Sequence, residues 1–370
     1  MDSPRQARMM PGYWCGQREA RGSTMTGHRM GSPAFRSVAI LLLSTLLAFA
    51  PPVWSAGPTQ AKRSLEEGYV TTPDGVRLYY QKVGTSPQVV IQPGRLFAFG
   101  DFVWLGEHVT LISYDMRNRG RSDLVVDESR ITFEQDVADL ETVRRHFGVE
   151  RATLLGYSYL GKIVVLYALE HPDRIDRIVQ FGPVPPAFAT EYRSEYVFID
   201  DPVDAAARAR LRALRSEQNY HITHPREYCV EEWNVVQRPQ LVGDPAKVGR
   251  VHIDVCDMPN EWPLLQVRHM RAHFEQSGMT HVTPLDRVSK LRTPVLTVHG
   301  TRDRNAPYGA GREWSYLLPN GRLLTVDGAG HHVFGEAREI VMPAVLEFLR
   351  GEWPEAAVEV TDDPTDRIAP

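Results

Sequence analysis

A serine, an aspartate and a histidine follow one another in an order that suits nucleophilic catalysis. Ser158 lies in the stretch LLGYSYLG, where an apolar run ends and a helical pattern begins. Asp303 follows the apolar run TPVLTVHG, and His331 directly follows the run RLLTVDGAG. A serine hydroxyl beside a histidine base that a carboxylate orients can attack a carbonyl carbon. We therefore expect Ser158 to be the nucleophile, His331 the base and Asp303 the acid that orients it.

The residues around Ser158 are typical of a sharp turn from a strand into a helix. The pattern G-x-S-x-x-G is close to the G-x-S-x-G elbow, in which the serine has a strained backbone and small neighbours. Gly156 meets that need, whereas the bulky Leu160 does not, and Gly161 comes one residue later. We expect a local shift of the helix to accommodate Leu160. An ordinary helix N-cap would also explain the serine, but not its two partners downstream.

Two members of the expected triad have rivals nearby in the sequence. His332 stands beside His331, although the position directly after the glycine favours His331. Asp303 could instead cap the helix that follows it, where acidic residues are common. Glu336 and Asp327 are further candidates for the acid.

Short apolar runs alternate with helical patterns along most of the chain. This alternation predicts a mostly parallel, doubly wound α/β sheet with helices on both faces. In such sheets ligands bind at the carboxyl ends of the strands, where the three candidate residues would then meet. A Pro-Asp-Gly turn between two β-rich runs predicts a hairpin over residues 68–84. The expected strands lie at 88–94, 108–115, 152–156, 177–182, 293–300 and 322–330, and the expected helices at 132–148, 159–171, 309–318 and 337–350.

Composition shifts divide the chain into five parts. About a hundred residues of helical pattern interrupt the alternation and predict a helical cap, and the acidic, proline-containing end predicts a disordered tail. The predicted parts are a leader with a signal peptide (1–56), a first core segment (57–183), the cap (184–285), a second core segment (286–353) and the tail (354–370).

The leader contains the order of segments that is typical of a secretory signal peptide. Arg29 and Arg36 precede the apolar run VAILLLSTLLAFA at 38–50, and small residues allow cleavage after Ser55 or Ala56. The run is short for a lasting membrane span. We therefore expect export to the periplasm or the medium, with no stable membrane span in the mature form.

Cysteine content and charge restrict the partners. In an oxidising compartment Cys229 and Cys256 could form a disulfide, and two buried free thiols are the equal alternative. Neither has a CxxC neighbour, so we expect no metal at these cysteines. The expected serine mechanism requires no metal and no organic cofactor. The net charge is −4 and no runs of Lys or Arg occur, so we expect no nucleic-acid partner. A small molecule or short peptide remains as the substrate.

The chain resembles the α/β-hydrolase family in four segments, which occur in the order YDMRNRGRSD, GYSYLG, HGTRD and GAGHH. Within that family, EYCVEEW and DVCDMPNEW in the cap and QFGPVPP before it are most similar to proline-iminopeptidase-like members. The resemblance implies an oxyanion hole built from the backbone N–H groups of Arg95 and Tyr159. The sequence departs from the family where Pro93-Gly94-Arg95 replaces the usual His-Gly, and where Asn118 replaces a glycine.

Three readings of function follow. The first is a secreted serine hydrolase that cleaves an ester, a lactone or a small amide, and the second is an aminopeptidase acting on short peptides. The third is a non-catalytic binding protein, which Leu160 and the missing His-Gly motivate. Arg95 could bind a substrate carboxylate, and Glu231 and Glu232 in the cap could bind a substrate amine. Solvated surface positions would explain these three charged residues as well.

Overall fold

A computed structural model describes residues 65–125, 127–217, 219–253, 255–256 and 283–366. The predicted leader and signal peptide lie outside these residues, and so does the part of the predicted cap at 257–282. Among the helices that the structure describes, we find none with the length and apolar character that crossing a membrane requires.

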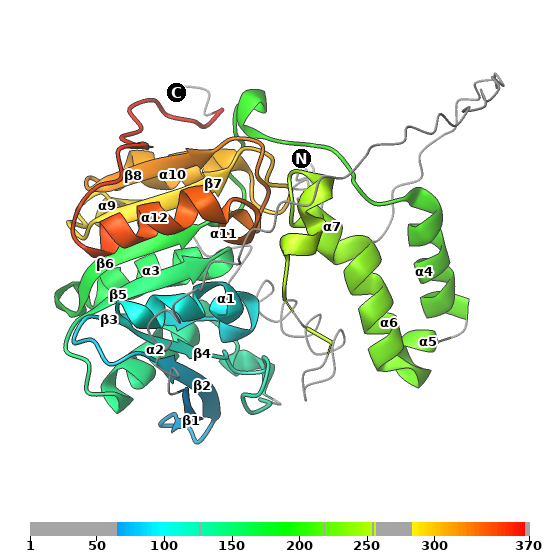
Figure 1. The fold of residues 1–370 in the computed structure, drawn as a ribbon, viewed down its shortest axis with the longest axis horizontal. Helices are drawn as coiled ribbons and strands as arrows, with labels where there is room; N and C mark the ends of the chain where they lie inside the picture. The colour runs from blue at the N-terminus through cyan, green and yellow to red at the C-terminus, as the bar shows by residue number, and fades with distance from the viewer. Residues whose placement is uncertain (1–64, 126, 218, 254, 257–282, 367–370) are drawn as a thin grey trace, which may run out of the picture. The chain divides into compact units, whose positions relative to one another are not determined.

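The core is one nine-stranded sheet in the order β1-β2-β4-β3-β5-β6-β7-β8-β9 (Figure 1). The pairs from β4 through β3, β5, β6 and β7 to β8 are all parallel, while β1–β2, β2–β4 and β8–β9 are antiparallel. The mostly parallel α/β sheet predicted from the sequence is thereby confirmed. The strands are β1 Glu66–Thr71, β2 Arg77–Val83, β3 Val89–Pro93, β4 Thr110–Tyr114, β5 Ala152–Tyr157, β6 Ile175–Phe181, β7 Val295–Gly300, β8 Gly321–Val326 and β9 Ala357–Val358.

The first two strands form the predicted hairpin. Their register runs from Glu66 opposite Lys82 to Thr71 opposite Arg77. Gly75 in the connecting turn has φ 86°, and a Cβ built there would meet no atom within 4 Å. Glycine is therefore used at this turn for its backbone conformation alone.

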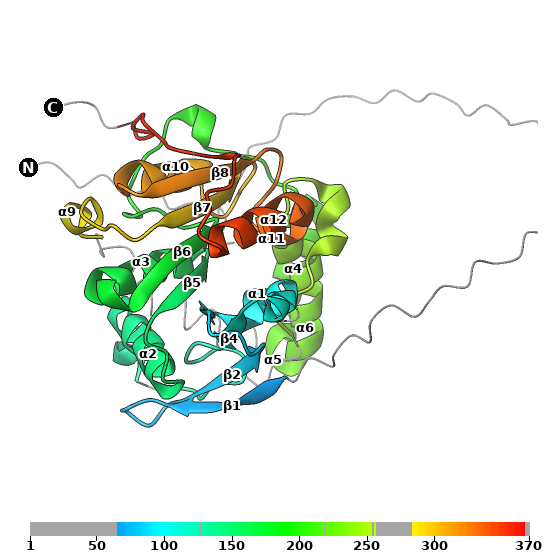
Figure 2. The same ribbon diagram turned by 60° about the vertical axis from the view of Figure 1, so that its left-hand side comes forward.

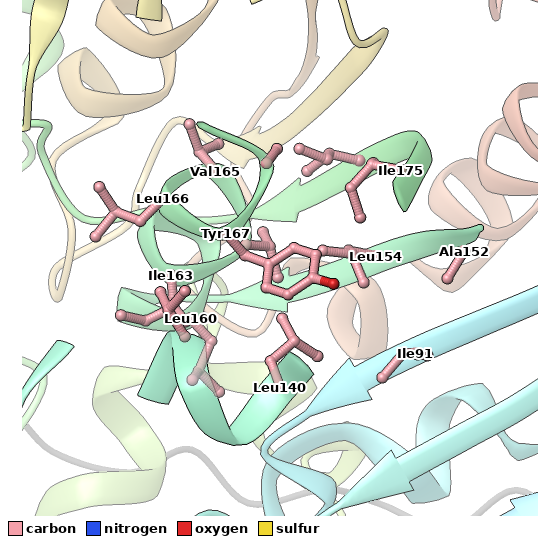
Figure 3. Close-up of a cluster of buried hydrophobic side chains, with 14 of the residues drawn as sticks. Ile91, Leu140, Ala152, Leu154, Leu160, Ile163, Val165, Leu166, Tyr167 and Ile175 are labelled. Atoms are coloured by element: carbon pink, nitrogen blue, oxygen red, sulfur yellow. The ribbon is translucent and has the colours of Figure 1, made fainter. Parts of the chain in front are cut away.

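Helices cover both faces of the sheet because the central strands are apolar on both sides. Every residue of β5 is buried. Its consecutive residues Leu154 and Leu155 point to opposite faces of the sheet and belong to different hydrophobic clusters. One cluster includes residues of α2, α3 and α10, and the other includes residues of α1, α11 and α12. Figure 2 shows these two groups of helices on opposite sides of the sheet. Figure 3 shows the first cluster, where α3 packs on β5. The core helices are α1 Arg95–Phe102, α2 Phe133–His146, α3 Tyr159–Glu170, α9 Leu285–Val288, α10 Tyr308–Leu317, α11 Val333–Glu336 and α12 Arg338–Leu349.

Between β6 and β7, the described residues of the predicted cap are mainly helical. Helix α4 covers the strongly helical pattern AAARARLRALRSE, and its apolar side packs with Tyr228 and Val236. The elements are α4 Ala205–Glu217, α5 Tyr220–Thr223, α6 Pro225–Glu232 and α7 Arg238–Gln240, with a π-helical turn at Trp233–Gln237 and a 3₁₀ turn at Pro245–Arg250.

The acidic tail is not disordered over its described residues, contrary to our prediction. Ala357 and Val360 are buried, and β9 pairs with the edge strand β8. Asp362 forms ion pairs with Arg193 at 2.7 Å and with Arg312. Apolar anchors and paired carboxylates thus hold a segment whose composition alone is typical of disorder.

Candidate active site

Ser158 lies at a strained turn between β5 and α3. Its backbone has φ 58° and ψ −126°, a region that costs a non-glycine residue about 1–3 kcal/mol. The Ser158 N–H donates to Phe181 O and its carbonyl accepts from Gly161 N–H, each at 2.9 Å. The side chain makes no capping hydrogen bond to α3, so the ordinary N-cap explanation does not hold.

The elbow accommodates Leu160 through a distant glycine. A Cβ on Gly156 would lie 2.4 Å from the Leu160 carbonyl oxygen and 2.8 Å from the Gly161 Cα, so the close approach of β5 and α3 needs Gly156. A Cβ on Gly161 would lie 2.9 Å from the Pro183 Cβ, so Gly161 makes room for the segment after β6. Leu160 is itself buried in the cluster of Figure 3. A Cβ on Gly94, in the loop after β3, would lie only 2.4 Å from Leu160 Cδ1. The missing side chain at Gly94 provides the space that we expected from a shift of the helix.

Asp303 and His331 are paired in the core. His331 Nδ1 lies 2.7 Å from Asp303 Oδ2, and both side chains are buried. Asp303 Oδ1 accepts the backbone N–H groups of Asn305 and Ala306 at 2.8 Å. Burial raises the pKa of Asp303, but its interactions with His331 and His299 outweigh this and hold the pKa well below its usual range. The carboxylate therefore stays ionised.

Contacts between the strand ends bring this pair beside the elbow. A Cβ on Gly182, directly after β6, would lie 3.0 Å from Asp303 Oδ2 and 3.1 Å from His331 Nδ1. The ring centroids of Tyr157 and His331 are 4.8 Å apart. Since Tyr157 precedes Ser158, all three predicted residues lie at the carboxyl edge of the parallel strands, where such sheets bind ligands.

The rival residues point elsewhere. His332 is buried with Nε2 3.2 Å from Asp101 Oδ2, on the side of α1. The Glu336 carboxylate accepts three backbone N–H groups at 2.7–2.9 Å, which join the His331 loop to the cap. Asp327 is exposed and accepts the Thr301 hydroxyl at 2.9 Å. None of the three contacts His331 in the way that Asp303 does.

His299 is a site residue that our sequence reasoning missed. It is fully buried on β7, and its Nε2 lies 3.1 Å from the same Asp303 oxygen that His331 contacts. The motif HGTRD contains it four residues before Asp303. His299 lies near the end of the predicted strand that leads to Asp303, and this position was the signal that could have identified it.

Two helix N-termini meet beside Ser158. Arg95 and Tyr159 are the first residues of α1 and α3, where backbone N–H groups have no intrahelical acceptor and an anion is favoured. The contact of Gly94 with Leu160 joins these two helix starts. Their N–H groups are therefore suited to an oxyanion, although the chain lacks the usual His-Gly.

The Arg95 side chain contradicts both of its predicted roles, as a substrate ligand and as a solvated group. Its guanidinium donates to the buried Asp115 at 2.9 and 3.1 Å and to Gln81 at 3.1 Å. The other Asp115 oxygen accepts the Leu96 N–H at 3.0 Å, so this carboxylate anchors the start of α1. Asn118 has φ 59° in the same loop, a conformation that asparagine tolerates better than most residues.

The two cap acids differ in their surroundings. Glu231 forms an ion pair with Arg210 of α4, which contradicts its predicted role as a free anion for a substrate amine. Burial raises the pKa of Glu232, and the smaller effect of the Arg215 charge opposes this shift.

Cys229 and Cys256 form a disulfide with their Cα atoms 5.8 Å apart. The bond joins α6 to Cys256, which follows the 3₁₀ turn at Pro245–Arg250 in the sequence. Cys229 packs with Leu96 of α1 and with Val242, so the disulfide lies in the apolar contact between the cap and the helix that carries Arg95.

Lys162, on α3, is buried and donates from Nζ to the Pro186 carbonyl at 2.9 Å. Its ammonium also lies over the rings of Phe133 and Phe188, at 5.3 and 5.0 Å from their centroids. Burial lowers the pKa of Lys162 to about 7.

Within the described residues, no group of three or more His, Cys, Asp or Glu side chains is arranged to hold a metal ion.

Comparison with known proteins gives one family and several distant relatives. A family model described as alpha/beta hydrolase fold matches residues 104–337. An esterase/perhydrolase of Acinetobacter calcoaceticus is 24% identical, over 76% of this chain and 99% of its own length. A proline iminopeptidase of Lactobacillus helveticus is 24% identical, over 74% and 95%.

Solved structures share the fold. An esterase from a Rhodococcus species has a TM-score of 0.57 at 22% identity and covers 77% of this chain and 98% of its own. An esterase from Exiguobacterium antarcticum has a TM-score of 0.56 at 18% identity and covers 76% and 98%. Since the family model spans more than half of a chain that also has the family's sheet and strand-end elbow, this protein belongs to the α/β-hydrolase family.

Proposed function

We propose that this protein is a serine hydrolase that cleaves an ester, a lactone or a small amide through an acyl-enzyme. The observation that carries the proposal is the buried Asp303–His331 hydrogen bond, 2.7 Å long, beside the strained turn at Ser158. A histidine oriented by an ionised carboxylate next to an elbow serine is the arrangement that activates a hydroxyl.

The reaction begins when Ser158 Oγ attacks the substrate carbonyl carbon. His331 takes the hydroxyl proton on Nε2, while Asp303 accepts the Nδ1–H and stabilises the imidazolium that forms. The carbonyl oxygen gains the negative charge, which the N–H groups of Arg95 and Tyr159 stabilise. Collapse of the intermediate breaks the bond to the leaving group, which takes the proton from His331. Water then attacks the acyl-serine with His331 as the base, which releases the acid and restores Ser158.

The ion pair of Glu231 favours an ester or lactone over a peptide substrate. An aminopeptidase needs an uncompensated carboxylate to bind the substrate ammonium. The carboxylate of Glu231 is paired with Arg210. Glu232 does not separate the two substrate classes, because burial raises its pKa more than the charge of Arg215 lowers it.

A non-catalytic binding role has lost its main motivation. Leu160 was the reason to doubt the elbow, and the gap left by Gly94 accommodates it without displacing Ser158. The N–H of Arg95 at the start of α1 likewise replaces the donor expected after a His-Gly.

We also propose that the protein is exported after cleavage near Ser55 or Ala56. The order of basic, apolar and small residues before position 57 supports this. The Cys229–Cys256 disulfide supports it as well, because such bonds persist in oxidising compartments.

Labelling with a fluorophosphonate probe tests the activated serine. We expect the wild type to react, and Ser158→Ala and His331→Ala to lose the label. Ser315→Ala is the matched control, since Ser315 is buried on α10 and its hydroxyl has no hydrogen-bond partner among the described residues. No labelling of the folded wild type, or labelling that survives Ser158→Ala, would refute the proposal.

Substrate panels then separate the two enzyme classes. We expect hydrolysis of short acyl esters, at rates that do not depend on a free amine. Hydrolysis of aminoacyl arylamides that stops when the amine is blocked would instead establish the aminopeptidase reading.

A further inference from the structure

Asp303 Oδ2 is shared by two histidines that come from different strand ends. His331 Nδ1 approaches it at 2.7 Å from the loop after β8, and His299 Nε2 approaches it at 3.1 Å from β7. The other oxygen, Oδ1, accepts two backbone N–H groups. Among the described residues, the Asp303 carboxylate therefore has four donors, one of which is a second imidazole.

The surroundings of His299 determine which of its nitrogens carries the proton. Nε2 faces two acceptors, Asp303 Oδ2 and the Ala306 carbonyl at 3.2 Å, so it must be the N–H. Nδ1 is buried and has no hydrogen-bond partner among the described residues. A proton there would be an unsatisfied buried donor. His299 is therefore a neutral imidazole that donates to the triad acid.

Packing holds the ring in this orientation. A Cβ on Gly311 would lie 2.3 Å from His299 Nδ1, so α10 packs against the ring only because residue 311 is glycine. The Tyr308 ring stands nearly perpendicular to it, with centroids 5.9 Å apart. His299 has no exposed surface.

We propose that His299 is a positioning residue that orients Asp303 and limits the basicity of His331 by withdrawing negative charge from their shared oxygen. The proposal rests on the function proposed above, because His331 must act as the base for its basicity to matter. His299 itself contacts neither substrate nor the reacting atoms.

The sign of the effect follows from the charge on Asp303. Each donor to the carboxylate reduces the charge that stabilises the His331 imidazolium. Loss of the His299 bond leaves more charge for His331, which then holds its proton to higher pH. Since a general base must be unprotonated, the acid limb of the pH profile moves upward.

Other titratable groups near the pair are engaged elsewhere or lie against a different side of it. The Tyr157 ring lies tilted beside the His331 ring, the Tyr308 ring lies edge-on to His299, and Arg304 pairs with Asp200. On the side of α11, Glu336 accepts three backbone N–H groups and His332 faces Asp101.

Three variants separate the hydrogen bond from the space that the ring fills. His299→Leu removes the donor, and His299→Gln keeps an N–H at a similar reach. Gly311→Ala leaves residue 299 intact but introduces a Cβ only 2.3 Å from the present position of Nδ1, and alanine suits the helix better than glycine. The pH dependence of the fluorophosphonate labelling rate is measured for each, together with the His331 titration by NMR.

In His299→Leu and Gly311→Ala, we expect the acid limb and the His331 midpoint to rise by roughly 0.5–1 pH unit. In His299→Gln, we expect both to stay close to their wild-type values. An unchanged midpoint in His299→Leu, or in Gly311→Ala if His299→Leu does not fold, would overturn the proposal while the labelled wild type upheld the hydrolase function. A wild type that does not label would refute the proposed function instead. The NMR midpoints would then still decide whether His299 tunes His331.

Discussion

Replacing Gly94 by alanine tests how the elbow accommodates Leu160. Two costs add in this variant. Gly94 has φ 79°, and a left-handed conformation costs an alanine about 1–2 kcal/mol. The new Cβ would also lie 2.4 Å from Leu160 Cδ1, and overpacking of this kind costs about 1–3 kcal/mol. We expect the free energy of unfolding to fall by about 2–5 kcal/mol in total.

A double-mutant cycle separates the two costs. Leu160→Ala removes the methyl group that the new Cβ would meet, at a cavity cost of about 2–5 kcal/mol of its own. In that background Gly94→Ala should cost only the conformational part, about 1–2 kcal/mol. The coupling energy between the two sites should therefore be about 1–3 kcal/mol.

Gly75→Ala is the matched control for the backbone. Gly75 has φ 86°, but a Cβ there meets nothing within 4 Å, so this variant measures the conformational cost without a clash. All five proteins are compared by urea-induced unfolding followed by circular dichroism. If Gly94→Ala cost the same with and without Leu160, or no more than Gly75→Ala, the account of the elbow would be wrong.

Two further predictions concern the disulfide and the buried Lys162. Cys256→Ser should lower the free energy of unfolding by about 3.5 kcal/mol, because it frees the loop that Cys229 closes; a denaturation midpoint equal to that of the oxidised wild type would contradict this. Burial lowers the pKa of Lys162 to about 7 in the folded protein. At pH values between about 7 and the ordinary pKa of lysine, the unfolded chain therefore holds more protons than the folded one. Stability should rise with pH in this window by up to about 1.4 kcal/mol per unit relative to Lys162→Met, and parallel pH curves for the two proteins would exclude it.

Periodicity and turn chemistry were sufficient to predict the fold. Strands buried on both faces are continuous apolar runs, and amphipathic helices repeat with their own period, so the alternation predicts a parallel sheet without any knowledge of contacts. The elbow was predictable for the same reason. Gly156 and Ser158 act within one turn of chain, where backbone geometry depends on the nearest residues.

The roles of charged residues were predicted less accurately, because the sequence does not show which oppositely charged residue each of them contacts in the fold. Arg95 could be a substrate ligand until the fold brings Asp115 against it, and Glu231 is a free anion until α4 supplies Arg210. The tail was predicted to be disordered from its acidic composition, but Asp362 meets arginines from two other segments.

The sequence by itself determined the alternation of strands and helices along the chain, the turn at Ser158 and the family, all of which depend on local patterns. Only the tertiary structure decided that Gly94 makes room for Leu160 and that His299 shares the oxygen of Asp303 with His331. These contacts join residues from separate strand ends. They depend on how the strands are ordered and how closely the helices pack, which no local pattern of residues contains.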